Sequence, residues 1–193
     1  MANAAIAHHI TYADYALGEE TSEVKHEWLD GKVFAMAGGI PEHAALAAAM
    51  LIHLGRELAG KPCRPFSSDL RVRVQATGLG TYPDITVVCN KLELDPDDKN
   101  SVVNPTVLVE ILSASTESYD RGKKFAHYKQ IPSLAHYVLV ATDRPYVEWL
   151  TRAPIEAGAG VWIHRAAQAG DRVRLSALDI GFDVDAIYSN PLG

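Results

Sequence analysis

The chain has 193 residues, of which 48% are hydrophobic and 22% charged, and its formal net charge is −6 at pH 7. This length and apolar content suit a single globular domain whose core is large enough to be stable without disulfide or metal cross-links. The net charge argues against a protein that coats nucleic acid through a broad basic surface, and no segment has the apolar run of a membrane span or the pattern of a signal peptide.

The N-terminus precedes the domain in our interpretation. Residues 1–10 show no pattern that would bury them, so we expect them to be loosely ordered and residues 11–193 to form one domain. Thr11 can cap a short helix over the sequence YADYAL, because its hydroxyl can accept a hydrogen bond from a free backbone N–H group.

A hairpin and a long helix follow. Asp30-Gly31 separates EVKHEWL from KVFAMAG, and this dipeptide favours the two-residue turn with positive φ. Gly38-Gly39 ends the hairpin. Pro41 suits the first turn of a helix, and the alanine- and leucine-rich run after it predicts a helix to about Leu58.

Strands dominate the rest of the chain. Apolar runs and alternation predict strands in CRPF, DLRVRV, PDITVVC, TVLVEIL and HYVLVA, which are residues 63–66, 69–74, 83–89, 106–112 and 136–141. The polar stretch 92–105 is interpreted as a surface loop, and a helix is expected over Glu117 to Gln130.

The C-terminal region predicts an antiparallel meander of edge strands over residues 146–152, 161–166 and 171–175, followed by a short helical turn at 182–188. The order of elements indicates an α/β or α+β sandwich with one mixed sheet flanked by helices. Cys63 and Cys89, in strand-like apolar contexts, are interpreted as two reduced thiols of a cytoplasmic protein rather than as a disulfide or a metal pair.

Two acidic residues stand in these apolar strands. Asp84 opens one strand and Glu110 lies inside another. If the two strands pair, alternation allows both carboxylates to point to the same side, where they could bind a hydrated Mg²⁺ ion for phosphodiester hydrolysis. The structural alternatives are a strand-start aspartate that caps local amides and a glutamate in a satisfied buried ion pair.

A lysine can complete this site. Phe125, Tyr128 and Ile131 define the apolar stripe of the predicted helix; Lys124 falls within it, whereas Lys123 projects toward solvent. A lysine that faces the core needs an anionic partner or a path to water. Asp120, four residues earlier, could supply an ordinary helical ion pair, and this is compatible with a role in the site.

Three further polar residues are accessory candidates. Glu27 lies in the hairpin, Asp69 begins a strand and His43 lies in the first turn of the long helix. Each could equally be a solvated or locally bonded group. The other histidines show no paired spacing of the kind that zinc sites use.

Several motifs in succession resemble one known family. HEWLDGKVFAMAGG, PEHA, SSDLRV, YPDITVV, VEILSAST, YDRGKKFAHY and HYVLV are similar in order and spacing to the Uma-two family of bacterial restriction endonuclease-like proteins, within the PD-(D/E)XK nuclease superfamily. The resemblance covers roughly residues 12–150.

The resemblance implies a restriction-endonuclease-like core and a set of roles. Asp84 and Glu110 would bind Mg²⁺ or Mn²⁺, the carbonyl of Ile111 would add an oxygen ligand, and Lys124 would replace the lysine that the superfamily places where Leu112 stands. Glu27 matches an acid that often completes such sites, and homodimers are common in the superfamily.

The sequence thus predicts a Mg²⁺-dependent DNA endonuclease, with DNA as a weak or transient partner. Two alternatives stay open. One is a non-catalytic binding or assembly module on the same scaffold, which the acidic balance and the displaced lysine favour. The other is a metal-dependent hydrolase of a small phosphorylated substrate, which a closed, narrow pocket would favour.

Overall fold

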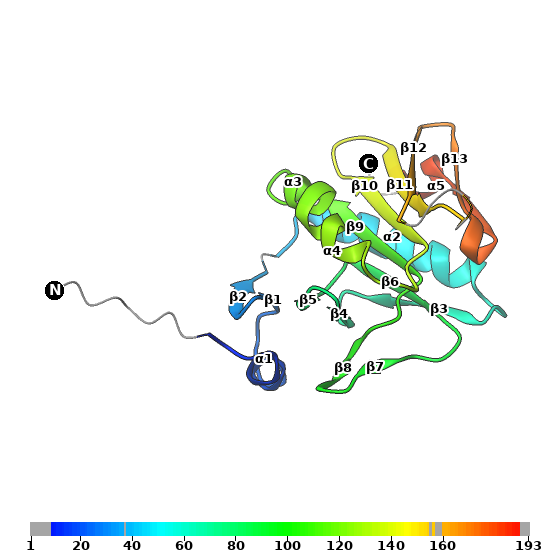
Figure 1. Ribbon diagram of the computed structural model, residues 1–193. Helices are drawn as coiled ribbons and strands as arrows, with labels where there is room; N and C mark the ends of the chain where they lie inside the picture. Colours follow the sequence, from blue (N-terminus) through cyan, green and yellow to red (C-terminus); the bar gives the residue numbers. More distant parts are fainter. Residues whose placement is uncertain (1–8, 37, 155, 157–159, 190–193) are drawn as a thin grey trace.

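Two six-stranded mixed sheets form the body of the protein in the computed structural model, which describes residues 9–36, 38–154, 156 and 160–189 (Figure 1). The first sheet, which we call sheet A, has the strand order β2 (Lys32–Ala35), β1 (His26–Leu29), β5 (Leu79–Thr81), β4 (Arg71–Val74), β8 (Asp98–Val102) and β7 (Leu94–Asp95). The second, sheet B, has the order β12 (Trp162–Gln168), β11 (Tyr146–Arg152), β10 (His136–Ala141), β9 (Val107–Leu112), β6 (Ile85–Cys89) and β3 (Cys63–Ser67). The α+β class is confirmed, but the prediction of one mixed sheet is wrong.

The helices and a small two-stranded sheet cover these sheets. The helices are α1 (Tyr12–Glu19), α2 (Pro41–Glu57), α3 (Glu117–Tyr119), α4 (Phe125–Tyr128) and α5 (Val184–Tyr188), with a π-helical turn η1 (Asp120–Lys124) between α3 and α4 and a 3₁₀ turn η3 (Ser176–Leu178). The strands β13 (Arg172–Leu175) and β14 (Ile180–Asp183) pair with each other. Among the described residues no helix is both long and apolar enough to cross a membrane.

Sheet B separates two hydrophobic cores, because its central strands bury both faces. On one face Val109 and Ile111 of β9 pack in a core with α2, the small sheet and α5. On the other face Leu108 and Leu112 pack with Tyr128 of α4 and with strands of sheet A. Buried strands of this kind read as continuous apolar runs, which is why they were predicted from the sequence.

The N-terminal predictions hold within the described residues. Thr11 caps α1 by accepting a hydrogen bond from the N–H group of Asp14, and the turn at Asp30 and Gly31 has φ of 49° and 75°. Most of the stretch expected to be loosely ordered, residues 1–8, lies outside the described residues. Ile10 belongs to the fold, since its N–H group donates to Gly31 and its carbonyl accepts from the Trp28 indole.

The expected surface loop at residues 92–105 is instead a hairpin. Strands β7 and β8 pair there, and β8 continues sheet A by pairing in parallel with β4. The buried carboxylate of Asp98 explains the difference, because its Oδ2 accepts a hydrogen bond from Arg71 Nη1 at 2.7 Å. A buried ion pair allows a charged segment to lie in a sheet.

The C-terminal meander is partly confirmed. Strands β11 and β12 extend sheet B as an antiparallel meander, but the third run of the prediction becomes β13 and leaves sheet B. The expected helical turn at residues 182–188 is the end of β14 followed by α5. The helix expected over Glu117 to Gln130 ends at Tyr128 and contains the π-helical turn η1.

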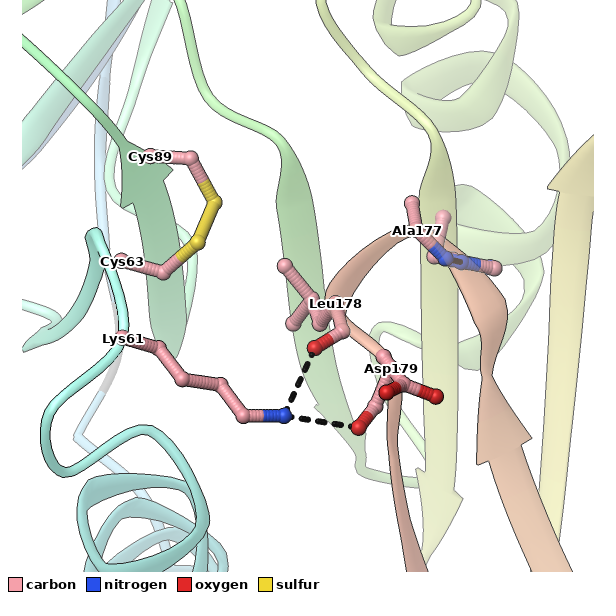
Figure 2. Close-up of a disulfide and its surroundings, with 7 residues drawn as sticks. Lys61, Cys63, Cys89, Ala177, Leu178 and Asp179 are labelled. Carbon is pink, nitrogen blue, oxygen red and sulfur yellow. Dashed lines mark hydrogen bonds between the residues drawn. A yellow bond between two sulfur atoms is a disulfide. The ribbon is translucent and has the colours of Figure 1, made fainter.

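Cys63 and Cys89 are joined by a disulfide, so the prediction of reduced thiols is wrong (Figure 2). The two residues lie directly opposite each other on the antiparallel pair β3–β6, which brings their side chains within bonding reach. Beside the disulfide, the Lys61 ammonium donates to the carbonyls of Leu178 and Asp179 at 3.1 and 2.7 Å, and this ties the start of β3 to the segment before β14.

A buried histidine joins sheet B to the 3₁₀ turn η3. His136 on β10 has no exposed surface. Its Nε2 accepts a hydrogen bond from the N–H group of Ala177 at 3.1 Å, so Nδ1 carries the proton and donates to Thr151 Oγ1 at 3.0 Å. Burial lowers the pKa of His136 to about 4.

We predict that His136 makes the protein sensitive to mild acid. An unfolded histidine binds a proton below about pH 6.5, whereas His136 stays neutral in the fold until about pH 4. The contribution of neutral His136 to the free energy of unfolding is therefore complete above pH 6.5. It is lost as the pH falls to 4, and the total loss is about 3 kcal/mol. We expect the free energy of unfolding, measured by urea denaturation, to fall less in His136→Gln than in the wild type when the pH is lowered from 7 to 5. Equal pH slopes for the wild type and His136→Gln would contradict the assignment.

Candidate functional site

The site is built where strand β5 of sheet A leads through Tyr82 and Pro83 into strand β6 of sheet B. Ile85 of β6 pairs with Val109 of β9. One residue further along this register, Asp84 lies opposite Glu110. Alternation places both side chains on the face of sheet B that also carries Leu108 and Leu112. The N–H group of Ile111 donates to Asp84 Oδ2 at 2.7 Å, in agreement with this register.

The ammonium of Lys124 lies at the centre of an acidic cluster. Lys124 Nζ is 2.9 Å from Glu110 Oε1, 3.4 Å from Glu27 Oε1 and 3.5 Å from Asp120 Oδ1. The side chain of Lys124 is buried and that of Lys123 is exposed, as the helical phase predicted. The three carboxylates come from β9, β1 and η1, so one cation joins both sheets to the helix.

The π-helical turn η1 positions this cation. Its first residue, Asp120, and its last, Lys124, are both buried and form an ion pair. Two adjacent strands of sheet B hold the turn, because Tyr137 of β10 donates to the Asp120 carbonyl and Arg121 pairs with the buried Glu148 of β11. Such turns occur mostly as short insertions in α-helices and are frequent at functional sites.

Three hydroxyl groups to which the sequence assigned no role complete the cluster. Tyr128 donates to Glu110 Oε1 at 2.8 Å, Tyr119 donates to Glu27 Oε2 at 3.2 Å, and Thr81 donates to Glu27 Oε1. The helical phase placed Tyr128 in the apolar stripe beside Lys124, but it gave no sign that the hydroxyl would bind Glu110. No local sequence signal indicates Thr81.

Burial and mutual repulsion perturb the acids of this cluster. Burial, together with the negative charges of Asp84 and Asp120, raises the pKa of Glu110 to about 8 despite the nearby ammonium. Burial also raises the pKa of Asp120. For Lys124, burial opposes the charge, but Glu110, Glu27 and Asp120 outweigh it and hold its pKa well above the ordinary value. The site therefore contains more carboxylates than cations, in surroundings where charge is poorly solvated.

Asp84 and His43 form the more exposed edge of the site. The side chains of Asp84 and His43 are 18% and 20% exposed, whereas that of Glu110 is 5% exposed. His43 Nε2 lies 3.2 Å from Asp84 Oδ2, and this hydrogen bond raises the pKa of His43. Of the two acids, Asp84 is therefore the more accessible to solvent.

The carboxylates fit a hydrated cation better than a closed metal cage. In the part of the chain that the structure describes, no three His, Cys, Asp or Glu side chains are arranged to hold a metal ion. The donors in the described residues engage Asp84 Oδ2 and Glu110 Oε1, and leave Asp84 Oδ1 and Glu110 Oε2 without a donor. Two carboxylate oxygens with several waters are a donor set that suits Mg²⁺, which keeps much of its hydration.

Asp69 does not belong to this cluster. Its side chain is 82% exposed, and it pairs with Lys25 at 2.6 Å. The hydroxyl of Ser67 is its other side-chain partner. Its position at the start of a strand, which resembles that of Asp84, was therefore a poor indicator, because the turn between β3 and β4 directs it to solvent.

Comparisons with known proteins agree with the resemblance noted from the motifs. The sequence model of the Uma2 family, described as putative restriction endonuclease, matches residues 11–186. An uncharacterized protein of Synechocystis sp. is 34% identical over 178 residues, covering 91% of this chain and 89% of the relative. A second Synechocystis protein, also uncharacterized, is 29% identical over 131 residues, covering 68% of this chain and 74% of the relative.

A solved structure shares the fold. The crystal structure of a putative nuclease belonging to DUF820 from Anabaena variabilis superposes with a TM-score of 0.72 at 16% identity. The match covers 91% of this chain and 96% of that protein.

We predict that removing the buried ammonium destabilises the fold strongly. Lys124→Ala leaves Glu110, Glu27 and Asp120 without their shared cation, and breaking a buried ion pair from one side costs about 3–5 kcal/mol. The matched control is Lys123→Ala, an exposed neighbour that should change the unfolding free energy by less than about 0.5 kcal/mol. Urea denaturation at pH 7 measures both, and similar values for the two variants would contradict the central place of Lys124.

Proposed function

Because this chain belongs to the Uma2 family of putative restriction endonucleases, we propose that it is a metal-dependent endonuclease that hydrolyses phosphodiester bonds in DNA. The observation that carries the proposal is the pairing of Asp84 and Glu110 on adjacent strands beside a buried lysine. Each acid is held through one oxygen and presents the other.

Asp84 and Glu110, with the carbonyl of Ile111, would hold Mg²⁺ or Mn²⁺. The ion would supply a polarised water and charge neutralisation at the scissile phosphate. The excess of buried carboxylates favours a dication, because added positive charge offsets the burial and the carboxylate repulsion that together raise the pKa of Glu110. A hydrated ion of this kind does not need a coordination shell made only of protein ligands.

Three other residues, Lys124, Glu27 and Asp120, would support the two acids. Lys124 holds Glu110 in place through a 2.9 Å contact, and its positive charge lies where it could orient water or stabilise the pentavalent phosphorane. Glu27, bound by Thr81, Tyr119 and Lys124, would act as an outer acid that keeps the ammonium centred. Asp120 would share that role from within η1.

A homodimer is part of the proposal, because two copies of the site could cut the two strands of a duplex. The net charge of −6 favours weak or transient contact with DNA over tight non-specific binding. A local approach of DNA to Asp84, the more exposed of the two acids, is compatible with this net charge.

We predict that Asp84→Asn and Glu110→Gln abolish metal-dependent nicking of plasmid DNA. Both substitutions keep the side-chain volume and remove the negative charge that would hold the ion. The wild type should nick supercoiled plasmid with Mg²⁺ or Mn²⁺ and stop when EDTA is added. Glu57→Ala, at the exposed far end of α2, is the control and should keep full activity.

Wild-type nicking that equals the background of both site variants would contradict the proposed chemistry. If calorimetry then also detected no Mn²⁺ binding, the scaffold would be a binding or assembly module without a nuclease site.

A further inference from the structure

His43 is a polar residue of the site for which the proposed chemistry has no role so far. It is the third residue of α2. Its Nε2 is 3.2 Å from Asp84 Oδ2. His43 thus contacts one of the two acids that would hold the ion.

The ring of His43 is seated on a glycine. A Cβ atom added to Gly39 would lie 2.8 Å from His43 Nδ1 and 3.0 Å from Cγ, whereas a Cβ atom on Gly38 would meet nothing within 4 Å. Real Cβ atoms essentially never approach other atoms as closely as 2.8 Å. The imidazole therefore keeps its position only because residue 39 has no side chain.

The consequence for Asp84 is a fixed carboxylate. One oxygen, Oδ2, accepts a hydrogen bond from the Ile111 N–H group at 2.7 Å and also lies 3.2 Å from His43 Nε2. A carboxylate with a single donor can turn about its Cβ–Cγ bond, since this torsion is broad. Two donors on the same oxygen hold the plane and keep Oδ1 directed away from them.

We propose that His43 is a positioning residue that holds Asp84 for cation binding, and that Gly39 is the seat that fixes the His43 ring. The inference rests on the proposed function, since it assigns a role within the same metal site. It differs from a purely structural role for His43, in which the histidine would anchor the first turn of α2 without affecting the ion.

The consequence is measurable as metal affinity. Partners that hydrogen-bond to a metal ligand typically contribute 10- to 100-fold in affinity. We expect His43→Ala to weaken Mn²⁺ binding by about 10- to 100-fold. His43→Gln should restore most of the loss, because its amide nitrogen can donate to Asp84 from about the place of Nε2.

The glycine pair provides the matched test. Gly39→Ala should displace the ring and weaken Mn²⁺ binding in the same direction as His43→Ala. Gly38→Ala adds the same methyl group one residue earlier, where the space is open, and should bind as the wild type. Isothermal titration calorimetry of the full chain with MnCl₂ measures all five proteins, and thermal unfolding without metal checks that the variants are folded.

The outcomes separate the two proposals. Equal Mn²⁺ affinity in the wild type and His43→Ala would overturn the role of His43 and leave the proposed function standing. Weak Mn²⁺ binding by His43→Ala together with unchanged Mn²⁺ binding by Gly39→Ala would overturn the role of Gly39 in fixing the His43 ring. A wild type that binds no Mn²⁺ would overturn the metal site itself, and the inference with it.

Discussion

The ammonium of Lys124 is the interaction on which the arrangement of this protein depends. It lies within 3.5 Å of three carboxylates, from β9 of sheet B, β1 of sheet A and the turn η1. A buried charge is stable only when its partners surround it, so this contact fixes how the two sheets and the helix meet. The same contact holds Glu110 beside Asp84, and in this way the packing of the fold and the geometry of the site have one origin.

Much of this arrangement could be predicted from local patterns. Alternation identified the strands of Asp84 and Glu110 and put each acid on a definite face, and helical phase distinguished Lys124 from Lys123. These periodicities depend on backbone geometry alone. The turn at Asp30 was equally predictable, because few residues adopt positive φ readily.

Other features depend on which segments meet, and local patterns do not encode this. The extension of sheet A by β8 and β7 follows from β8 pairing with β4 in parallel, supported by the buried ion pair of Arg71 and Asp98. The Cys63–Cys89 disulfide follows from the register of β3 and β6. Thr81 reaches the site only because β5 continues into β6. The role of Asp84 and Glu110 as metal ligands is still a prediction.

The most direct test of this account is a crystal structure of the wild type soaked with MnCl₂, with anomalous data collected to locate the metal. The account predicts one Mn²⁺ peak between Asp84 Oδ1 and Glu110 Oε2, with Lys124 still in contact with Glu110 Oε1. A peak elsewhere, or no peak at saturating MnCl₂ while the two carboxylates keep their present partners, would contradict it.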